Sequence, residues 1–390
     1  MIERRLTRRK KSKIIAYKIS LIIICSSEDA YFYSVLISSL LILLVYGFVF
    51  TWLTIPRIAE VVKKYRIFRK PSKRDLHWRF VPKLTGLSFY VALLLVAFAF
   101  VPYVDVNRLI LVLGAGAIVV YVGVRDDIYQ LRPTVKLMLQ LIAIAFFAFG
   151  DDLVVRNLHG FLNIYEIPIG ADYFLTFFIG VFMINSFNLC DGIDGLAAML
   201  GVVISISYGA IFYIIKDYLF LSFCVILIGC LFAFLRFNIP KKNKVFMGDT
   251  GSLFLGFIFF LFTMYFVNNE SVNLSGFLPD KSLVTLAALC IFIVPIIDSG
   301  SVFFSRVWNK KSPFKPDNNH THHLILHFTK SHVMASLMIS ASFIATLVLF
   351  TKLAFSLNHE ITIFIFLIYL FLCYVFIHFI RRKVKKERVR

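Results

Sequence analysis

The composition of the chain is too apolar for a soluble protein. Its 390 residues are 59% hydrophobic and only 16% charged, whereas a soluble domain carries about 25% charged residues. The net charge of +20 comes from 42 basic and 22 acidic residues. Most basic residues lie between apolar segments, where they meet lipid headgroups. No soluble basic part remains, which argues against nucleic acid as a partner, and the sequence predicts a polytopic membrane protein.

The first 30 residues differ from the rest of the chain. Residues 1–13 contain seven arginines and lysines, and the apolar stretch 14–25 that follows is too short to span a bilayer. This pattern is typical of a signal peptide, of an interfacial helix, or of a chain whose start is assigned too early, and the sequence leaves these three open. We expect residues 31–380 to form a single transmembrane domain and residues 381–390 a basic cytoplasmic tail.

Eleven apolar segments follow in chain order. They are residues 31–55, 86–104, 107–124, 134–149, 171–187, 196–215, 218–237, 252–267, 282–303, 332–355 and 361–380. A spanning helix needs about 20 residues, so the shorter segments must borrow flanking residues. The prediction is an all-α membrane protein with about 10–11 transmembrane helices, whose interiors hold almost no ionisable group. The six cysteines lack any CxxC spacing and are expected to be small buried apolar residues without a disulfide or zinc framework.

The basic clusters alternate between the loops. Counting the loops from the first segment, the odd ones contain most of the arginines and lysines, and the even ones are short or weakly charged. The positive-inside rule places the odd loops in the cytoplasm. Every dense polar motif lies in one of these loops or at its helix ends, so we expect one cytoplasmic face to carry them all.

The first two motifs are rich in carboxylates. Asp126 and Asp127 end the third segment, and Asp191 and Asp194 follow the fifth, after the amides Asn185 and Asn188. Adjacent carboxylates repel each other unless a cation separates them, so both motifs are suited to a metal ion beside an anionic substrate, with Lys136 as a counter-charge for phosphate. Ordinary loops that end membrane helices have a similar composition, and the residues alone leave that alternative open.

The other motifs combine a helix start with a histidine cluster. In Phe246-Met-Gly-Asp249-Thr-Gly-Ser252, backbone amides favour phosphate, Asp249 suits Mg²⁺ and Phe246 suits a nucleobase, although a simple helix cap explains the same residues. His320, His322 and His323 have no thiolate partners for zinc, and they are better suited to donating hydrogen bonds to phosphate or sugar oxygens. The basic loop 70–86, with Lys73 and His77, is interpreted as either a lipid anchor or an anion site.

These four motifs, in this order across a multi-span chain, resemble those of the polyprenyl-phosphate N-acetylhexosamine-1-phosphate transferases, members of glycosyltransferase family 4. The resemblance runs from about residue 70 to residue 323 and on into the last spans. The His-x-His-His form is similar to that of the enzymes acting on UDP-GlcNAc, and less similar to that of the phospho-MurNAc-pentapeptide translocase. Two loop positions differ, because Thr85 and Asn309 stand where the family often has glycine.

The resemblance implies transfer of N-acetylhexosamine-1-phosphate, with GlcNAc-1-phosphate the leading choice, from a UDP-sugar to undecaprenyl phosphate with release of UMP. This would be the first membrane step of cell-surface polysaccharide synthesis, at the cytoplasmic face of the bacterial inner membrane. Another UDP-N-acetylated sugar, or phospho-MurNAc-pentapeptide, is the alternative. The implied cofactor is Mg²⁺, with Mn²⁺ as a substitute, and the resemblance leaves a homodimer open.

The resemblance also implies a role for each motif residue. The implied catalytic residues are Asp126, Asp127, Asp249, His322 and His323. The three aspartates of that set are the implied metal ligands. The nucleotide sugar is expected to meet Asn185, Asn188, Asp191, Asp194, Phe246, His320, His322 and His323. The lipid phosphate is expected to meet Lys136, Lys73 and His77.

Two other classes of membrane protein are less consistent with the sequence. An anion transporter or channel would place ionisable residues near the middle of its spans and broken helices in related halves, and neither pattern is evident. A receptor or structural protein would not require five aspartates on one face.

Overall fold

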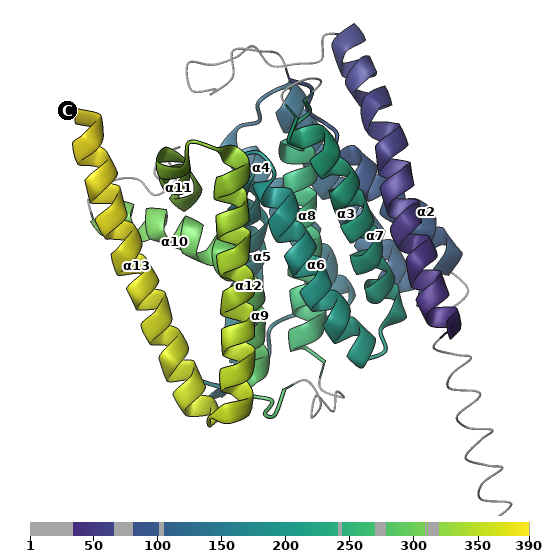
Figure 1. Ribbon diagram of the computed structural model, residues 1–390. Coiled ribbons are helices and arrows are strands. Elements are labelled where there is room, and N and C mark those ends of the chain that lie inside the picture. Colours follow the sequence, from purple (N-terminus) through teal and green to yellow (C-terminus); the bar gives the residue numbers. More distant parts are fainter. Residues whose placement is uncertain are drawn as a thin grey trace, which may run out of the picture.

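The computed structural model describes residues 34–65, 81–100, 105–240, 244–269, 278–308, 310 and 320–389. The basic N-terminal segment, Lys73, His77 and Asn309 lie outside these ranges. The described part is almost entirely helical (Figure 1). Its helices are Ser34–Lys64, α2 (Leu87–Phe100), α3 (Val106–Ile128), α4 (Pro133–Gly150), α5 (Ala171–Cys190), α6 (Leu196–Ile214), α7 (Tyr218–Asn238), α8 (Gly248–Val267), α9 (Leu283–Ile291), α10 (Ile293–Trp308), α11 (Thr321–Thr329), α12 (His332–Ser356) and α13 (His359–Val389).

Each of the eleven predicted apolar segments overlaps a helix or a helix pair. Within the described ranges, nine helices are long and apolar enough to span a membrane, and the bent pair α9–α10 makes a tenth. The remaining segment corresponds to the shorter apolar helix Leu87–Ala99. The all-α polytopic prediction is therefore confirmed, and the protein is a multi-pass membrane protein.

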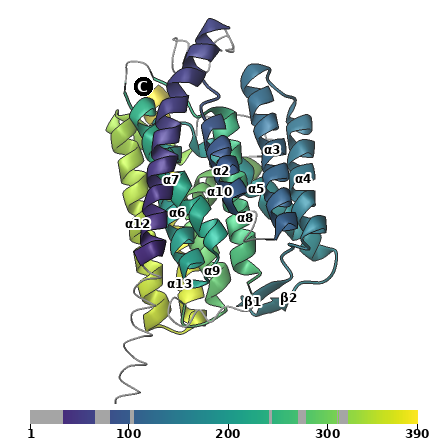
Figure 2. The same ribbon diagram turned by 90° about the vertical axis from the view of Figure 1, so that its right-hand side faces the viewer.

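Except for α10, which crosses the bundle, the long helices alternate in direction, so most connections gather at two ends of the bundle (Figures 1 and 2). The end drawn uppermost holds the turns that follow α3 and α5 and the starts of α8 and α11. The opposite end holds a small antiparallel hairpin, which the sequence analysis missed, formed by β1 (Asn157–Phe161) and β2 (Ile164–Glu166). The four polar motifs therefore share one end of the molecule, as their loop positions predict.

Helix α8 forms the axis of the bundle. In the most apolar 18-residue stretch of α8, 94% of the residues are buried, compared with 11% in the corresponding stretch of the helix Ser34–Lys64. Glycines bring neighbouring backbones against it: a methyl group at Gly123 of α3 would lie 2.4 Å from the Cα of Thr250, and one at Gly256 would lie 2.8 Å from the Cα of Ile184 on α5. Helices α3 and α5 pack against α8 along their length. This close packing fixes the position of the first turn of α8 along the bundle axis, relative to α3 and α5.

The apolar segment 282–303 is not one straight span. It breaks into α9 and α10 with a bend of 77°. Pro295 lies four residues after Ile291, so it has no N–H to donate to that carbonyl, and its ring would clash with it. The segment also contains Asp298, which is only 3% exposed. Asp298 is thus an exception to the expectation that span interiors hold almost no ionisable group, and the break within segment 282–303 was not predicted.

The predicted basic tail is a continuation of a helix. Helix α13 extends to Val389, and Val384 is buried against Leu324 of α11. Nε2 of His327 on α11 is hydrogen-bonded to Oε2 of Glu387 at 3.1 Å. The C-terminal turns therefore brace the helix that carries the histidine motif.

Candidate active site

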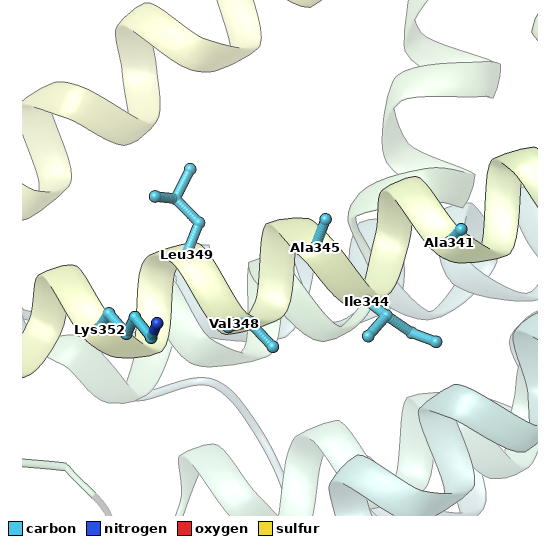
Figure 3. Close-up of a pocket in the computed structure, with 6 residues that line it drawn as sticks. All are labelled: Ala341, Ile344, Ala345, Val348, Leu349 and Lys352. Atoms are coloured by element: carbon cyan, nitrogen blue, oxygen red, sulfur yellow. The ribbon is translucent and has the colours of Figure 1, made fainter.

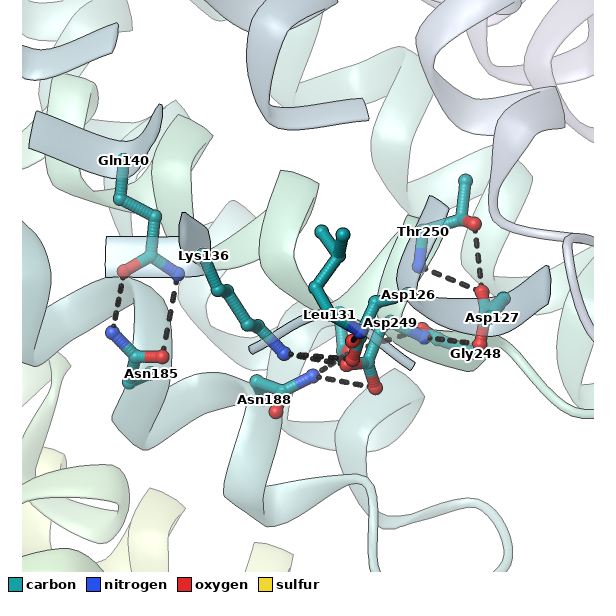
Figure 4. Close-up of polar contacts among 11 residues, drawn as sticks. Asp126, Asp127, Leu131, Lys136, Gln140, Asn185, Asn188, Gly248, Asp249 and Thr250 are labelled. Atoms are coloured by element: carbon teal, nitrogen blue, oxygen red, sulfur yellow. Dashed lines mark hydrogen bonds and ion pairs between the residues drawn. The ribbon is translucent and has the colours of Figure 1, made fainter. Parts of the chain in front are cut away.

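A lysine and two aspartates form the centre of the polar cluster (Figure 4). The Nζ of Lys136, on the first turns of α4, lies 2.5 Å from Oδ2 of Asp249 and 3.2 Å from Oδ2 of Asp126. Asp126 also accepts a hydrogen bond of 2.7 Å from the backbone amide of Leu131. Residues that lie 113 positions apart in the sequence thus meet around one ammonium group. Two carboxylate oxygens already converge on a cation at this point.

Asp127 faces away from that lysine and caps α8. Its carboxylate accepts the backbone amides of Asp249 (3.1 Å) and Thr250 (3.0 Å) and the Thr250 hydroxyl (2.7 Å). The fit requires glycine at position 248, where φ is +74° and a methyl group would lie 2.4 Å from Oδ2 of Asp127. The amides at the start of α8, which the sequence suggested for phosphate, are therefore occupied by Asp127.

The amides of the α5 motif support the same cluster. Asn188 donates to Oδ1 of Asp249 (3.2 Å) and to the Ser252 hydroxyl (2.7 Å). One turn earlier, Asn185 and Gln140 of α4 exchange hydrogen bonds of 2.8 and 3.3 Å through their side-chain amides. Asn188 thus orients Asp249, and Asn185 joins α5 to α4.

The cluster contains more carboxyl groups than ammonium groups. Burial, together with the charges of Asp249 and Asp127, raises the pKa of Asp191 well above its usual range, and the charge of Lys83 opposes this rise. The carboxyl groups of Asp126, Asp127, Asp191 and Asp249 thus outnumber the ammonium groups of Lys136 and Lys83 near them. Carboxylate and amide oxygens are the ligands that hard divalent cations prefer. The donor set fits a divalent cation between Asp249 and Asp126.

Asp194 belongs to a neighbouring cluster. Its Oδ2 lies 2.5 Å from Nζ of Lys244 and 3.2 Å from Nδ1 of His332, at the start of α12. Burial raises the pKa of Asp194, but the hydrogen bonds from His332 and Lys244 outweigh burial and lower it below its usual range. The Phe246 ring lies 5.0 Å from the same Nζ, and the Phe246 carbonyl accepts the Thr85 hydroxyl at 2.8 Å. Thr85, one of the two departures from the family pattern, therefore anchors this loop.

The histidine motif lies at the start of α11 around Asp298. His320 and His322 each have Nδ1 3.1 Å from Oδ2 of Asp298, and both are buried. The rings of His322 and His323 are 4.3 Å apart. A methyl group at Gly192 would lie 2.3 Å from Nε2 of His322, so this nitrogen abuts the turn after Asp191. The histidines and the aspartate turn are thus brought together, as the sequence predicts, whereas Asp298, inside an apolar segment, was missed.

A shallow apolar groove elsewhere does not belong to this cluster. It has a volume of about 520 Å³ and lies along α12 (Figure 3), in the half of that helix farther from His332 at its start. Its lining is Ala341, Ile344, Ala345, Val348, Leu349 and Lys352. With a single charged group and no carboxylate, this groove lacks the groups that the chemistry of the polar cluster would need.

Comparison with known proteins gives a consistent result. The sequence profile of glycosyl transferase family 4 matches residues 109–267. A probable undecaprenyl-phosphate N-acetylglucosaminyl 1-phosphate transferase of Bacillus subtilis (strain 168) is 32% identical over 315 residues, which cover 77% of this chain and 82% of the relative. The chain belongs to glycosyl transferase family 4. Undecaprenyl-phosphate alpha-N-acetylglucosaminyl 1-phosphate transferases of Escherichia coli (strain K12) and Yersinia pestis are 29% and 28% identical, and each match covers 77% of the chain and at least 80% of the relative.

Membership of glycosyl transferase family 4 makes the protein a membrane-bound transferase. The profile match contains the clustered residues of α3, α5 and α8, including Asp126 and Asp249, and ends before Asp298 and the histidine motif. The longer matches to the relatives span about three quarters of the chain. The carboxylate cluster therefore lies within the part of the chain that defines the family.

Proposed function

We propose that the protein transfers N-acetylhexosamine-1-phosphate from a UDP-sugar to undecaprenyl phosphate and releases UMP. The proposed sugar is GlcNAc, because the relatives that match most of the chain are named for the N-acetylglucosaminyl 1-phosphate group and for undecaprenyl phosphate. The reaction would begin the synthesis of a cell-surface polysaccharide. The single observation that carries this proposal is the convergence of Asp249, Asp126 and Lys136 at one end of a transmembrane bundle.

The location of the cluster suits two substrates of opposite solubility. A polyprenyl phosphate remains in the bilayer, so only its phosphate can reach groups at the end of the bundle, whereas a nucleotide sugar arrives from water. The cluster lies at the ends of α3 and α5 and at the start of α8, where the chain leaves the apolar spans. The described basic residues Arg125, Arg132 and Arg236 also follow or end spans at this end. With the positive-inside rule, they support our proposal that the site faces the cytoplasm, at the inner membrane of a bacterium.

A divalent cation, proposed as Mg²⁺, would be held by Asp249 and Asp126, with Asp127 securing the helix that carries Asp249. When bound, it would supply positive charge against the diphosphate of the donor. The protein's own residues supply orientation. Lys136 is placed to bind the phosphate of the lipid, Asn188 keeps Asp249 in position, and the turn after Asp191 lies between the carboxylates and the histidines.

We favour direct attack of the lipid phosphate on the phosphorus that carries the sugar. A phosphate monoester has a second pKa of about 6, so at pH 7 its oxygen is already mostly unprotonated and needs no strong base. An oxygen–phosphorus bond to the lipid then forms as the bond to UMP breaks, and UMP leaves with the electron pair. An aspartate nucleophile would have to give up its partners: Asp249 contacts Lys136 and Asn188, and Asp127 accepts three hydrogen bonds.

The test measures UMP release from purified protein in detergent, with undecaprenyl phosphate, Mg²⁺ and each of several UDP-N-acetylhexosamines and UDP-MurNAc-pentapeptide. We expect UMP and lipid-linked sugar in equal amounts, with UDP-GlcNAc the best donor, and loss of both when EDTA is added or lipid is omitted. Asp280→Asn, at the opposite end of the bundle, is the matched control and should retain activity. Absence of UMP release with every donor would contradict the proposal, and a different preferred donor would correct the sugar.

A further inference from the structure

Asp298 is a buried carboxylate that no sequence motif indicated. It lies on α10, beyond the 77° bend, and Figure 1 shows α10 crossing the bundle beside α11. Burying a carboxylate is costly unless donors replace the lost water. Three donors do so here: the backbone amide of Thr321 binds Oδ1 at 2.5 Å, and Nδ1 of His320 and of His322 both bind Oδ2 at 3.1 Å.

The two hydrogen bonds to the imidazoles determine which nitrogen of each ring carries a proton. An ionised carboxylate only accepts hydrogen bonds, so the nitrogen that faces it must carry N–H. Both Nδ1 atoms are therefore donors to Asp298, and each Nε2 is left for another partner. The Nε2 of His322 lies against Gly192, next to Asp191 of the carboxylate cluster. The bond to Thr321 also satisfies an amide at the start of α11, which has no side-chain cap of its own.

We infer that Asp298 is a positioning residue for the transfer reaction, which fixes the tautomer and the orientation of His320 and His322 so that Nε2 of His322 faces the substrate. This inference rests on the proposed function, in which the histidines contact the donor's sugar pyrophosphate. A carboxylate that holds the far nitrogen of a ligating histidine has the same effect in metal sites, where its loss costs about 10–100-fold in activity or affinity. Asp298 acts through the imidazoles and does not itself reach the substrate.

Asp298→Asn separates positioning from simple support of the fold. The side-chain oxygen of the asparagine can accept hydrogen bonds either from the imidazoles or from the backbone amide of Thr321, but not from both. With its NH₂ toward the rings, it requires Nδ1 to become an acceptor and shifts the proton to Nε2. The matched control is Asp280→Asn, which alters another aspartate–histidine pair, 3.2 Å from Nδ1 of His359, at the opposite end.

The primary readout needs no substrate. In ¹⁵N-histidine spectra of the purified protein, assigned with His320→Gln and His322→Gln, we expect protonated Nδ1 and unprotonated Nε2 for both neutral rings. Asp298→Asn should move His322 toward the Nε2–H form, and Asp280→Asn should leave it unchanged. Unprotonated Nδ1 in the parent protein would overturn the inference whether or not the proposed function holds, and so would unchanged imidazole signals in both Asp298→Asn and Asp298→Ala.

The second readout is kinetic. Asp298→Asn should lower kcat/KM by about 10–100-fold, yet have little further effect in a His322→Gln background, because residues that act through one another are not additive. Full additivity would make Asp298 a purely structural residue and overturn the inference. Zinc bound at one ion per chain and lost in Asp298→Asn would also overturn it, because the three side chains would then be metal ligands.

Discussion

Asp127→Ala should destabilise the protein, because Asp127 holds the first turn of α8. The substitution leaves the backbone amides of Asp249 and Thr250 without their acceptor. A buried donor without a partner costs about 1–3 kcal/mol, and loss of a helix cap costs about 0.5–2 kcal/mol. The Thr250 hydroxyl can rotate to another acceptor, so it adds little. Both values describe the loss of the same hydrogen bonds, so they are not added, and we expect the free energy of unfolding to fall by about 1–3 kcal/mol.

The assay is SDS titration in mixed micelles, followed by circular dichroism. Asp126→Ala is the matched control, because Asp126 accepts a hydrogen bond from only one backbone amide. Its other partner, Lys136, would still form its ion pair with Asp249. Its effect on unfolding should stay below about 1 kcal/mol, the value of one exchanged hydrogen bond. We expect both variants to lose transfer activity. If Asp127→Ala unfolds like the parent protein, Asp127 does not cap α8 in the way described.

Three further predictions concern the cation, the mechanism and the topology. Asp249→Asn should stay folded in detergent but lose transfer, because an amide binds Mg²⁺ far more weakly than a carboxylate; near-normal turnover at low Mg²⁺ would remove Asp249 from the metal site. Delipidated protein with UDP-sugar and Mg²⁺ should not exchange labelled UMP into the donor; exchange that disappears in Asp126→Asn would instead indicate a covalent intermediate. In intact cells an impermeant thiol reagent should label Asn163→Cys in the hairpin turn but not Tyr129→Cys after α3, and the reverse pattern would invert the proposed orientation.

Apolar length predicted most of the bundle, because each run of side chains that cannot face water must be placed in lipid or in the protein interior. The same reasoning missed the break at Phe292, since both halves of the segment 282–303 are apolar and length alone cannot separate them. A signal was present in Pro295, whose missing N–H prevents a continuous helix. The hairpin 157–166 was missed because its eight strand residues are too few for a clear alternating pattern.

The site could be predicted as a set of motifs but not as a set of contacts. Motif order placed Asp126 and Asp249 at one end of the bundle, and the structure adds that both share Lys136. The sequence alone does not distinguish the adjacent residues Asp126 and Asp127. The rotation of α3 relative to α8 determines that Asp126 contacts Lys136 and that Asp127 accepts hydrogen bonds from backbone amides. Asp298 was beyond sequence reasoning for a similar reason, because its partners lie 22 and 24 residues away across a bend.

The burial of α8 has a consequence for how the protein tolerates sequence change. Only the first turn of this helix, with Asp249, reaches the candidate site, yet the packed backbone positions Gly251 and Gly256 and nearly every side chain below them lie inside the bundle. An added methyl group at Gly251 would lie 2.8 Å from the Cα of Gly86, so a larger residue there would push the turn before α2 away from α8. In a complete substitution scan, α8 should accept fewer replacements than α13, although most of it never approaches a substrate. Selection on α8 then acts through the distances between helices. A larger side chain far from Asp249 would displace the whole of α8 and would thereby move Asp249.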